Sequence, residues 1–269
     1  MTKEAYFEQE GVKLFNGDCL EIMPTLEKGS IDLIFADPPY RLSNGGITCK
    51  AGQIALVDKG NWDKSQGFDE DFKFTYNWIK LCKDLLKPNG TIWISGTPHS
   101  IFQVGYALQA LGFHIMNEIT WYKPNAPPNL SCRYFAHAHE SLIWAKKDKE
   151  AKHTFNYELM KKWDDRISPS GKQMRSVWCI PLTSLEEKKN GKHPTQKPLE
   201  LLRRVILSSS NNEDLVLDPF VGSGTTGVIA KRFNRKFIGI EIEKDFCELA
   251  IRRINEQILL KQNINTSSS

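Results

Sequence analysis

Residues 215–227 read LVLDPFVGSGTTG, and this stretch decides the fold. The apolar run 215–217 predicts a short buried strand, and the glycine loop after it runs into a predicted helix over residues 224–233. A G-x-G-x-x-G pattern between a strand and a helix is typical of nucleoside-binding α/β folds. Its glycines let the backbone approach a ligand closely, and the helix N-terminus offers free N–H groups to a carboxylate or phosphate.

An acidic residue follows at the position that such a fold requires. Glu241 lies in the next predicted strand, residues 237–242, nineteen positions after Gly222. An acid at this place can accept hydrogen bonds from both hydroxyls of a ribose. The alternative is a glycine turn that only packs a helix. NAD is the usual ligand of the pattern, but little chain follows the unit to build the second half of a dinucleotide site.

Strand-like and helix-like patterns alternate along the rest of the chain. We predict strands over residues 12–15, 31–36, 91–95, 114–121 and 141–145, and helices over residues 20–26, 72–86, 100–111, 199–208 and 244–260. This alternation predicts an α/β fold with a mostly parallel central sheet and helices on both faces. Ligands bind such sheets beyond the carboxyl ends of the strands.

Composition excludes several protein classes. Of the 269 residues, 40% are hydrophobic and 25% are charged, which excludes collagen-like, disordered and disulfide-scaffold chains. No apolar run approaches the ~18 residues of a membrane helix and the N-terminus is polar, so we expect a cytoplasmic protein without membrane contact. The six cysteines form no C-x-x-C pair, and the close pair His137 and His139 lacks a cluster of further ligands, so we expect no metal site.

A second loop carries chemistry. Asp37-Pro38-Pro39-Tyr40 directly follows the predicted buried strand 31–36. The prolines have no N–H, so the local main chain presents carbonyl acceptors, to which Asp37 adds a carboxylate and Tyr40 a flat aromatic face. This set suits a planar substrate with an amino group, such as a nucleobase. The alternative is a plain Pro-Pro turn at the end of a strand.

With these two loops in place, the sequence resembles the amino-group DNA methyltransferases that use S-adenosylmethionine. DPPY resembles their catalytic motif, and DPFVGSGTT at residues 218–226 resembles their methionine-side loop. HPTQKP at residues 193–198 and GDCL at residues 17–20 are similar to two further family elements. DPPY precedes the glycine loop, an order that resembles the β class of MboII and RsrI. The resemblance implies a Rossmann-like methyltransferase fold with circularly permuted motif order.

The resemblance also implies the site residues. Asp18 and the backbone of Cys19 would hold the adenine of the cofactor, and Glu241 the ribose. Lys197 would lie near the methionine carboxylate, and Asp218 would accept from the methionine ammonium. The expected cofactor-binding residues are Asp18, Cys19, Asp37, Lys197, Asp218, Phe220, Gly222, Ser223, Gly224, Thr225 and Glu241, and the expected catalytic residues are Asp37, Pro38, Pro39 and Tyr40.

The implied reaction is methylation of the N6 amine of a flipped-out adenine in duplex DNA. The Asp37 carboxylate and the Pro38 carbonyl would each accept one N6–H, and the extruded base would stack on Tyr40. If only the ring of Tyr40 matters, Tyr40→Phe should have a mild effect. N4-cytosine methylation is the nearest alternative, although that class more often carries Ser in place of Asp37. A non-catalytic DNA-binding subunit is disfavoured by the intact motifs, and RNA by the lack of a recognisable RNA-binding module.

The resemblance divides the chain into parts. Residues 1–147 and 192–262 are expected to form the catalytic and cofactor-binding domain, and residues 263–269 a flexible tail. Residues 148–191 match the family weakly, and the window 146–192 holds twelve Lys or Arg against seven Asp or Glu. We expect this segment to be a target-recognition insert, the alternative being a solvated insertion. A role in a restriction–modification system is expected, while the sequence leaves a homodimer and a cognate restriction endonuclease open.

Overall fold

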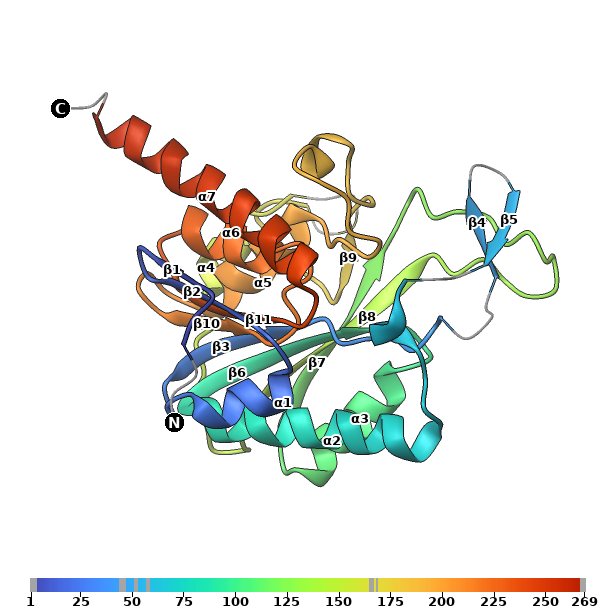
Figure 1. The fold of residues 1–269 in the computed structure, drawn as a ribbon, viewed down its shortest axis with the longest axis horizontal. Helices are drawn as coiled ribbons and strands as arrows, with labels where there is room; N and C mark the ends of the chain where they lie inside the picture. The colour runs from blue at the N-terminus through green and yellow to red at the C-terminus, as the bar shows by residue number, and fades with distance from the viewer. Residues whose placement is uncertain are drawn as a thin grey trace.

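The computed structural model describes residues 4–43, 47–50, 53–56, 59–164, 167 and 169–266. A nine-stranded sheet has the strand order β1-β2-β11-β10-β3-β6-β8-β7-β9, and β4 and β5 form a separate hairpin (Figure 1). The strands are β1 (Phe7–Gln9), β2 (Val12–Asn16), β3 (Ile31–Ala36), β4 (Ile47–Lys50), β5 (Gln53–Leu56), β6 (Leu86–Gly96), β7 (His114–Tyr122), β8 (His139–Lys146), β9 (Val177–Cys179), β10 (Leu215–Asp218) and β11 (Lys236–Glu241). The helices are α1 (Cys19–Ile22), α2 (Phe68–Leu85), α3 (Ile101–Ala110), α4 (Tyr157–Met160), α5 (Leu199–Ser209), α6 (Thr225–Arg232) and α7 (Lys244–Thr266), with short 3-10 turns at Met23–Thr25, Asn61–Asp63 and Glu186–Lys188.

The pairing of the strands confirms the predicted fold class. Strands β2, β11, β10, β3 and β6 run parallel to one another, β1 and β8 run against their neighbours, and β9 is parallel to β7. The chain passes from β3 through α2 to β6, and from β10 through α6 to β11, so the two crossovers leave in opposite directions. The loops after β3 and β10 therefore lie next to each other at a topological switch point, where α/β proteins bind ligands.

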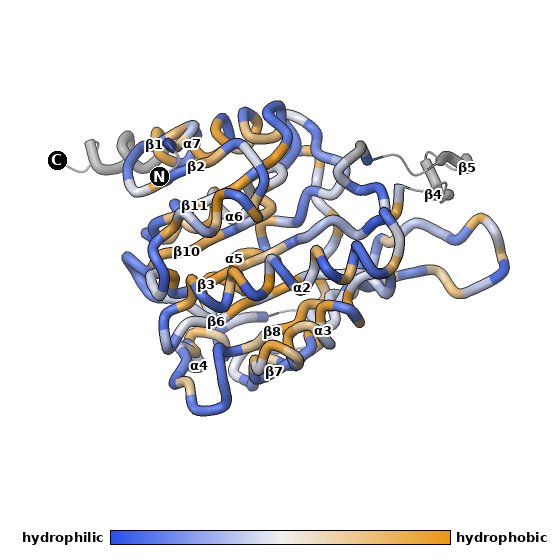
Figure 2. Tube along the Cα trace, turned by 60° about the horizontal axis from the view of Figure 1, so that its bottom comes forward, coloured by the Kyte–Doolittle hydropathy of each residue, from blue (hydrophilic) through white to orange (hydrophobic). Residues whose placement is uncertain are grey.

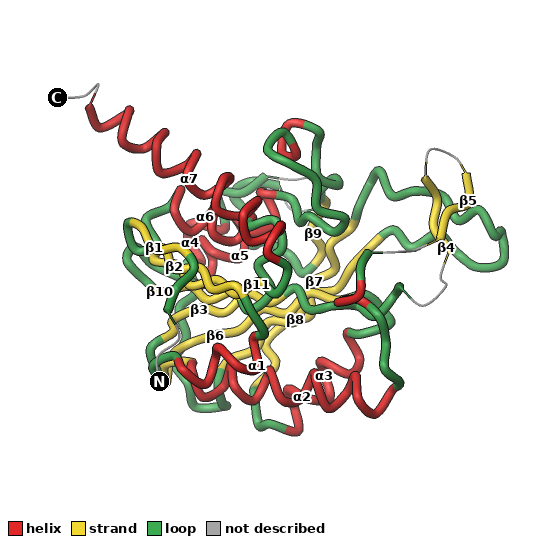
Figure 3. Tube along the Cα trace, in the orientation of Figure 1, coloured by secondary structure: helices red, strands yellow, loops and turns green. Residues whose placement is uncertain are grey.

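Helices cover both faces of the sheet, with α1, α2 and α3 on one face and α4 to α7 on the other (Figure 3). The apolar run of β3 explains this, because successive strand residues point to opposite faces. Leu33 and Phe35 join the core beneath α5, α6 and α7, whereas Ile34 and Ala36 join the core above α1, α2 and α3. Apolar residues accordingly concentrate along the central strands in Figure 2.

Helix α2 packs on the sheet through one apolar face. Trp78, Ile79, Cys82 and Leu85 are its buried residues toward the C-terminal end, and their spacing places them on one face of a helix. Three acidic residues occupy the first turn, where the helix dipole favours negative charge. The helix begins at Phe68 rather than at the predicted residue 72, because these polar residues hide its start from a hydrophobic pattern.

The structure differs from the predicted elements at short or polar segments. The three-residue strands β1 and β9 were not predicted, because so few residues show no period. Helix α7 continues to Thr266, so residues 263–266 of the expected tail are helical, and residues 267–269 lie outside the described residues. The stretch 41–71, which shows no sustained hydrophobic period in the sequence, contains the hairpin β4–β5 and a 3-10 turn.

Segment 148–191 is joined closely to the main body. Strand β9 belongs to it and pairs with β7, and Trp178 on that strand is buried in the core. The Asn156 side-chain amide also donates to the carbonyls of Leu207 and Ser210 at the end of α5. The segment therefore contributes a strand and anchoring contacts to the large domain in addition to its exposed loops. No helix within the described part of the chain is long and apolar enough to cross a membrane.

Gly224 provides a test of the contact between α6 and α7. It has a φ of +80°, and an added Cβ would lie 2.8 Å from the Cα of Ala250 in α7. Gly224→Ala should lower the free energy of unfolding by about 2–4 kcal/mol, the sum of left-handed strain and overpacking. Gly171→Ala is the matched control, because Gly171 has a φ of +82° with nothing within 4 Å of the added Cβ. Urea denaturation of both variants measures the difference, and equal losses would contradict the packing argument.

Candidate functional site

A cavity of about 330 Å³ opens at the carboxyl ends of the parallel strands. The two loops identified in the sequence both line it, since they follow the neighbouring strands β3 and β10. Of the predicted site residues, those that line the cavity are Asp18, Cys19, Asp37, Pro38, Pro39, Tyr40, Lys197, Asp218, Phe220, Gly222, Ser223, Thr225 and Glu241. Gly224 is the exception, because it caps α6 against α7.

The glycine loop is fixed to the end of β11. The Gly222 N–H donates to Glu241 Oε2 at 2.7 Å, and the Glu243 N–H donates to Glu241 Oε1 at 2.9 Å. The Val221 N–H also donates to the carbonyl of Ile240 at 3.0 Å. Burial raises the pKa of Glu241 although these N–H groups oppose the shift. The predicted acid therefore holds the loop in shape and faces the cavity at the same time.

Asp218 is a buried carboxylate held by uncharged donors. Its Oδ1 accepts from the Phe220 N–H at 2.9 Å and its Oδ2 from the Thr226 hydroxyl at 2.5 Å. Burial raises the pKa of Asp218 to about 7, and the charges of Asp37 and Glu241 act in the same direction. A cationic ligand group beside this side chain would favour its ionised form.

The end of β2 forms the neighbouring wall. Asp18 caps α1 by accepting a 2.8 Å hydrogen bond from the Leu20 N–H. Burial and the nearby Asp18 raise the pKa of the Cys19 thiol, so the thiol stays protonated at neutral pH. Ile242 and Phe246 add apolar surface to this part of the lining. Polar groups at Asp18 and Cys19 next to the apolar side chains of Ile242 and Phe246 suit a flat ring with polar edges.

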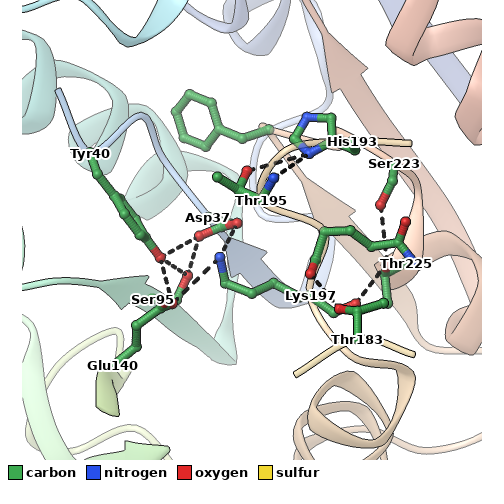
Figure 4. A network of polar contacts seen from close by, with 12 residues as sticks. Asp37, Tyr40, Ser95, Glu140, Thr183, His193, Thr195, Lys197, Ser223 and Thr225 are labelled. Atoms are coloured by element: carbon green, nitrogen blue, oxygen red, sulfur yellow. Dashed lines mark hydrogen bonds and ion pairs between the residues drawn. The ribbon is translucent and has the colours of Figure 1, made fainter. Parts of the chain in front are cut away.

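The other end of the cavity contains a buried cluster around Asp37 (Figure 4). Asp37 Oδ1 accepts from the Tyr40 hydroxyl at 2.6 Å and from the Ser95 hydroxyl at 2.5 Å, and Oδ2 accepts from Lys197 Nζ at 2.6 Å. Burial alone would raise the pKa of Asp37, but the Lys197 ammonium and the three donated hydrogen bonds bring it below its ordinary value. Asp37 is therefore an ionised acceptor at neutral pH.

Lys197 connects Asp37 with a second acid. Its Nζ lies 3.6 Å from Glu140 Oε2, and Glu140 Oε1 lies 2.5 Å from Lys123 Nζ. Burial alone would lower the pKa of Lys197. The negative charges of Asp37 and Glu140 outweigh this effect and raise the pKa above its ordinary value, so the ammonium form persists. Two carboxylates and two ammonium groups thus neutralise one another. The Nζ of Lys197 lies in this cluster, while its backbone carbonyl accepts from the Thr225 hydroxyl at 3.2 Å.

Sequence reasoning missed several members of the site. Ser95 lies near the carboxyl end of the parallel strand β6, so the rule that led to DPPY could have found it. Glu140 lies in the antiparallel strand β8, whose amino end meets the same edge of the sheet, and only the pairing of β8 with β6 reveals this. His193 also lines the cavity, 4.3 Å from the Phe246 ring between centroids. Burial lowers the pKa of His193 to about 4, so its imidazole is neutral.

The segment after DPPY returns to the cavity and is anchored there by Asp63. This fully buried carboxylate accepts from the N–H groups of Arg41 and Leu42 at 2.8 and 3.1 Å and from the Ser43 hydroxyl at 2.8 Å. Trp62 next to it lines the cavity. Phe68, at the start of α2, is 71% exposed.

Replacing Lys197 tests the charge cluster. Lys197→Met removes the ammonium group that contacts both Asp37 and Glu140, so the pKa values of the two carboxyl groups should rise and stability should fall by about 3–5 kcal/mol at pH 8. Near pH 5 a carboxyl group can take up a proton, so the loss should be smaller there. Urea denaturation at both pH values measures this difference, and equal losses would contradict it. Lys189→Met, which removes an exposed ion pair with Glu256, should change little at either pH.

The chain is similar to known DNA methylases. The DNA methylase family (N6_N4_Mtase) matches residues 31–252. The chain is 53% identical over 257 residues to the type II methyltransferase M2.LlaDCHI of Lactococcus lactis subsp. cremoris, covering 95% of this chain and 93% of that protein. It is 52% identical to M2.DpnII of Streptococcus pneumoniae, covering 96% and 94%.

Solved structures agree with these matches. The M1.HpyAVI–SAM complex superposes with a TM-score of 0.66 at 30% identity, covering 91% of this chain and 99% of that chain. The cytosine-N4-specific PvuII DNA methyltransferase has a TM-score of 0.72 at 20% identity, covering 93% and 89%, and therefore supports the fold alone. The chain belongs to the DNA methylase family.

Proposed function

We propose that this DNA methyltransferase transfers the methyl group of S-adenosylmethionine to the N6 amine of a flipped-out adenine in duplex DNA, as a β-class enzyme. The observation that carries the proposal is one cavity that contains both an ionised Asp37 and the glycine loop. A nucleobase amine beside Asp37 and a cofactor on the glycine loop would then share one enclosed space. Placing two reactants in attack geometry supplies much of the catalysis in such a transfer.

The residues around the glycine loop fit S-adenosylmethionine. Asp218 offers a buried carboxylate to the methionine ammonium, and Gly222, which has no side chain, presents only backbone to the cavity. Glu241 offers its carboxylate to the ribose, and Ile242 and Phe246 offer apolar contact to the adenine ring. When bound, this cofactor supplies an electrophilic methyl group. The roles of Asp18, Cys19, Phe220, Ser223 and Thr225 in the same pocket are part of the proposal.

Asp37 would make the substrate amine nucleophilic without removing a proton first. The amine lone pair is delocalised into the base, and hydrogen bonds from both N–H groups to Asp37 and to the Pro38 carbonyl would favour tetrahedral nitrogen. These acceptors also stabilise the positive charge that grows on nitrogen during methyl transfer. The lowered pKa of Asp37 suits an acceptor and not a strong base. The methylated ammonium is far more acidic than the starting amine, so it can lose its proton afterwards.

Tyr40 requires a broader role than base stacking. Its side chain is 5% exposed, and its hydroxyl donates to Asp37 Oδ1 at 2.6 Å. The expectation that only the ring matters, and that Tyr40→Phe is mild, therefore changes. The hydroxyl helps to orient the carboxylate that the substrate amine must meet, and a base could reach the ring only if local side chains adjust.

The partners follow from the same proposal. The relatives are named type II methyltransferases, so we include a role as the modification enzyme of a restriction–modification system, acting on cellular DNA in the cytoplasm. Exposed basic residues of segment 148–191, among them Lys162, Lys172 and Arg175, would contact DNA for target recognition. A cognate restriction endonuclease would share the DNA sequence, and dimers occur in the resembled class.

Methyl transfer from labelled S-adenosylmethionine to duplex DNA tests the proposal directly. The purified chain should incorporate label, and digestion of the product should release N6-methyladenine. Sequencing of methylated positions in DNA from cells that express the chain would then give the target site. Release of N4-methylcytosine would overturn the adenine assignment, and no incorporation into DNA of varied sequence would overturn the catalytic one.

Asp37→Ala should abolish transfer and leave cofactor binding within a fewfold of the unaltered chain. The acceptor for the amine is lost, and at least a 10³-fold drop in kcat is expected if positioning and charge stabilisation act together. Single-turnover kinetics and calorimetric cofactor titration measure the two effects. Asp69→Ala, which removes an exposed carboxylate in the first turn of α2, is the control. Near-normal turnover of Asp37→Ala would contradict the mechanism.

Tyr40→Phe should lower kcat by about 5- to 30-fold, because Asp37 loses one charge-assisted hydrogen bond of roughly 1–2 kcal/mol. Tyr40→Ala should lose more, since the ring is lost as well. The KM for DNA should change less than kcat in Tyr40→Phe. A Tyr40→Phe enzyme with unchanged kcat would show that the hydroxyl does not position Asp37.

A further inference from the structure

Residues 123–138 form a long connection between two antiparallel neighbours, β7 and β8. Hairpin connections commonly need only about 2–5 residues, and a long ordered loop is usually functional. The loop projects from the same end of the molecule as the hairpin β4–β5, away from the C-terminal end of α7 (Figures 1 and 3). The loop is therefore placed to meet a large substrate at that end.

The tip of this loop exposes aromatic side chains. Phe135 is 96% exposed and Tyr134 is 58% exposed. The backbone beneath them is held by Asn129, whose Oδ1 accepts from the Ser131 N–H at 3.0 Å and whose side-chain amide donates to the Tyr134 carbonyl at 2.6 Å. The loop thus has its own hydrogen bonds, and the ring of Phe135 contributes little to its folding.

The root of the loop lies in the cluster around Asp37. Lys123, its first residue, pairs with Glu140 at 2.5 Å, and its N–H donates to the Ala138 carbonyl at 2.8 Å, which closes the base of the loop. Glu140 in turn contacts Lys197. The exposed tip and the cluster that orients Asp37 are therefore parts of one connected structure.

The charge of the loop suits a polyanion. No Asp or Glu occurs from Lys123 to His139, and Arg133 stands beside the exposed aromatic pair. Proteins that open a duplex commonly insert an apolar wedge between bases while cationic side chains contact the phosphates. A base drawn out of the stack toward Asp37 would leave a gap that a flat ring can fill.

We propose that Phe135 inserts into the DNA base stack where the target adenine leaves it, with Arg133 on the adjacent phosphate. This inference rests on the proposed function. It makes Phe135 a positioning residue, since it touches the neighbouring bases and not the reacting amine. Stacking by the ring compensates for the contacts that the extruded base gives up.

The test uses the full chain and a duplex that carries the target site found by sequencing of methylated DNA. Phe135→Ala should lower kcat/KM on this duplex by roughly 5- to 150-fold, the range that loss of one stacking contact gives. The loss should be less than threefold on a duplex in which the target adenine faces an abasic gap, because extrusion is then easier.

With 2-aminopurine at the target position, the variant should show a smaller rise in fluorescence on binding. Phe135→Trp should keep activity within threefold.

Phe102→Ala is the matched control, because Phe102 is a 76% exposed ring on α3. This variant should behave like the unaltered chain in every assay. Equal kcat/KM for Phe135→Ala and the unaltered chain, or equal losses on paired and gapped duplexes, would overturn the inference. The inference would also be overturned if Phe135→Ala changed the oligomeric state, measured by light scattering, without changing kcat/KM. That result would assign the ring to contacts between copies of the chain. Failure of the unaltered chain to methylate any DNA would instead overturn the proposed function, and the inference with it.

Discussion

The geometry of the site depends on the ion pair between Asp37 and Lys197, whose side chains are 16% and 6% exposed. Two carboxylates buried without a cation would each take up a proton, and a protonated Asp37 would offer a hydroxyl where an amine requires an acceptor. Lys197 prevents this, and Lys123 does the same for Glu140. The four charges come from segments far apart in the chain, so the complete cluster can exist only in the folded protein.

Sheet topology brings those segments together. The crossovers from β3 and β10 leave in opposite directions, and the ends of these two strands meet without a helix between them. Asp37 follows one strand and the glycine loop follows the other. The antiparallel strands β7 and β8 then bring Lys123 and Glu140 to the same edge. The proposed reaction between two bound molecules would require such a meeting point, because each molecule would be held by a different loop.

Elements were predictable from the sequence where a residue pattern is compatible with a single local structure. The strand over residues 31–36 was predicted with its observed bounds, since a short apolar run that ends at two prolines leaves few alternatives. The glycine loop and Glu241 were found because spacing and strand order fix their meeting. The role of Glu140 and the hydroxyl contacts of Tyr40 were not predictable, because they depend on which strands pair and on how side chains pack. Strand β9 was too short to produce a period.

The contacts of Asp63 have a consequence for how this protein could diverge. Asp63 accepts hydrogen bonds from Arg41, Leu42 and Ser43, which lie 20 to 22 residues earlier in the chain. These bonds close a ring of chain whose two ends are fixed beside the DPPY loop. The free energy of closing such a ring depends only weakly on its length, by about 0.6 kcal/mol per doubling. Descendants of the gene could lengthen, shorten or exchange the part of the enclosed segment that precedes Lys59, while Lys59 and Trp62 keep their places in the cavity lining. New DNA contacts could thus be acquired there independently of the chemistry.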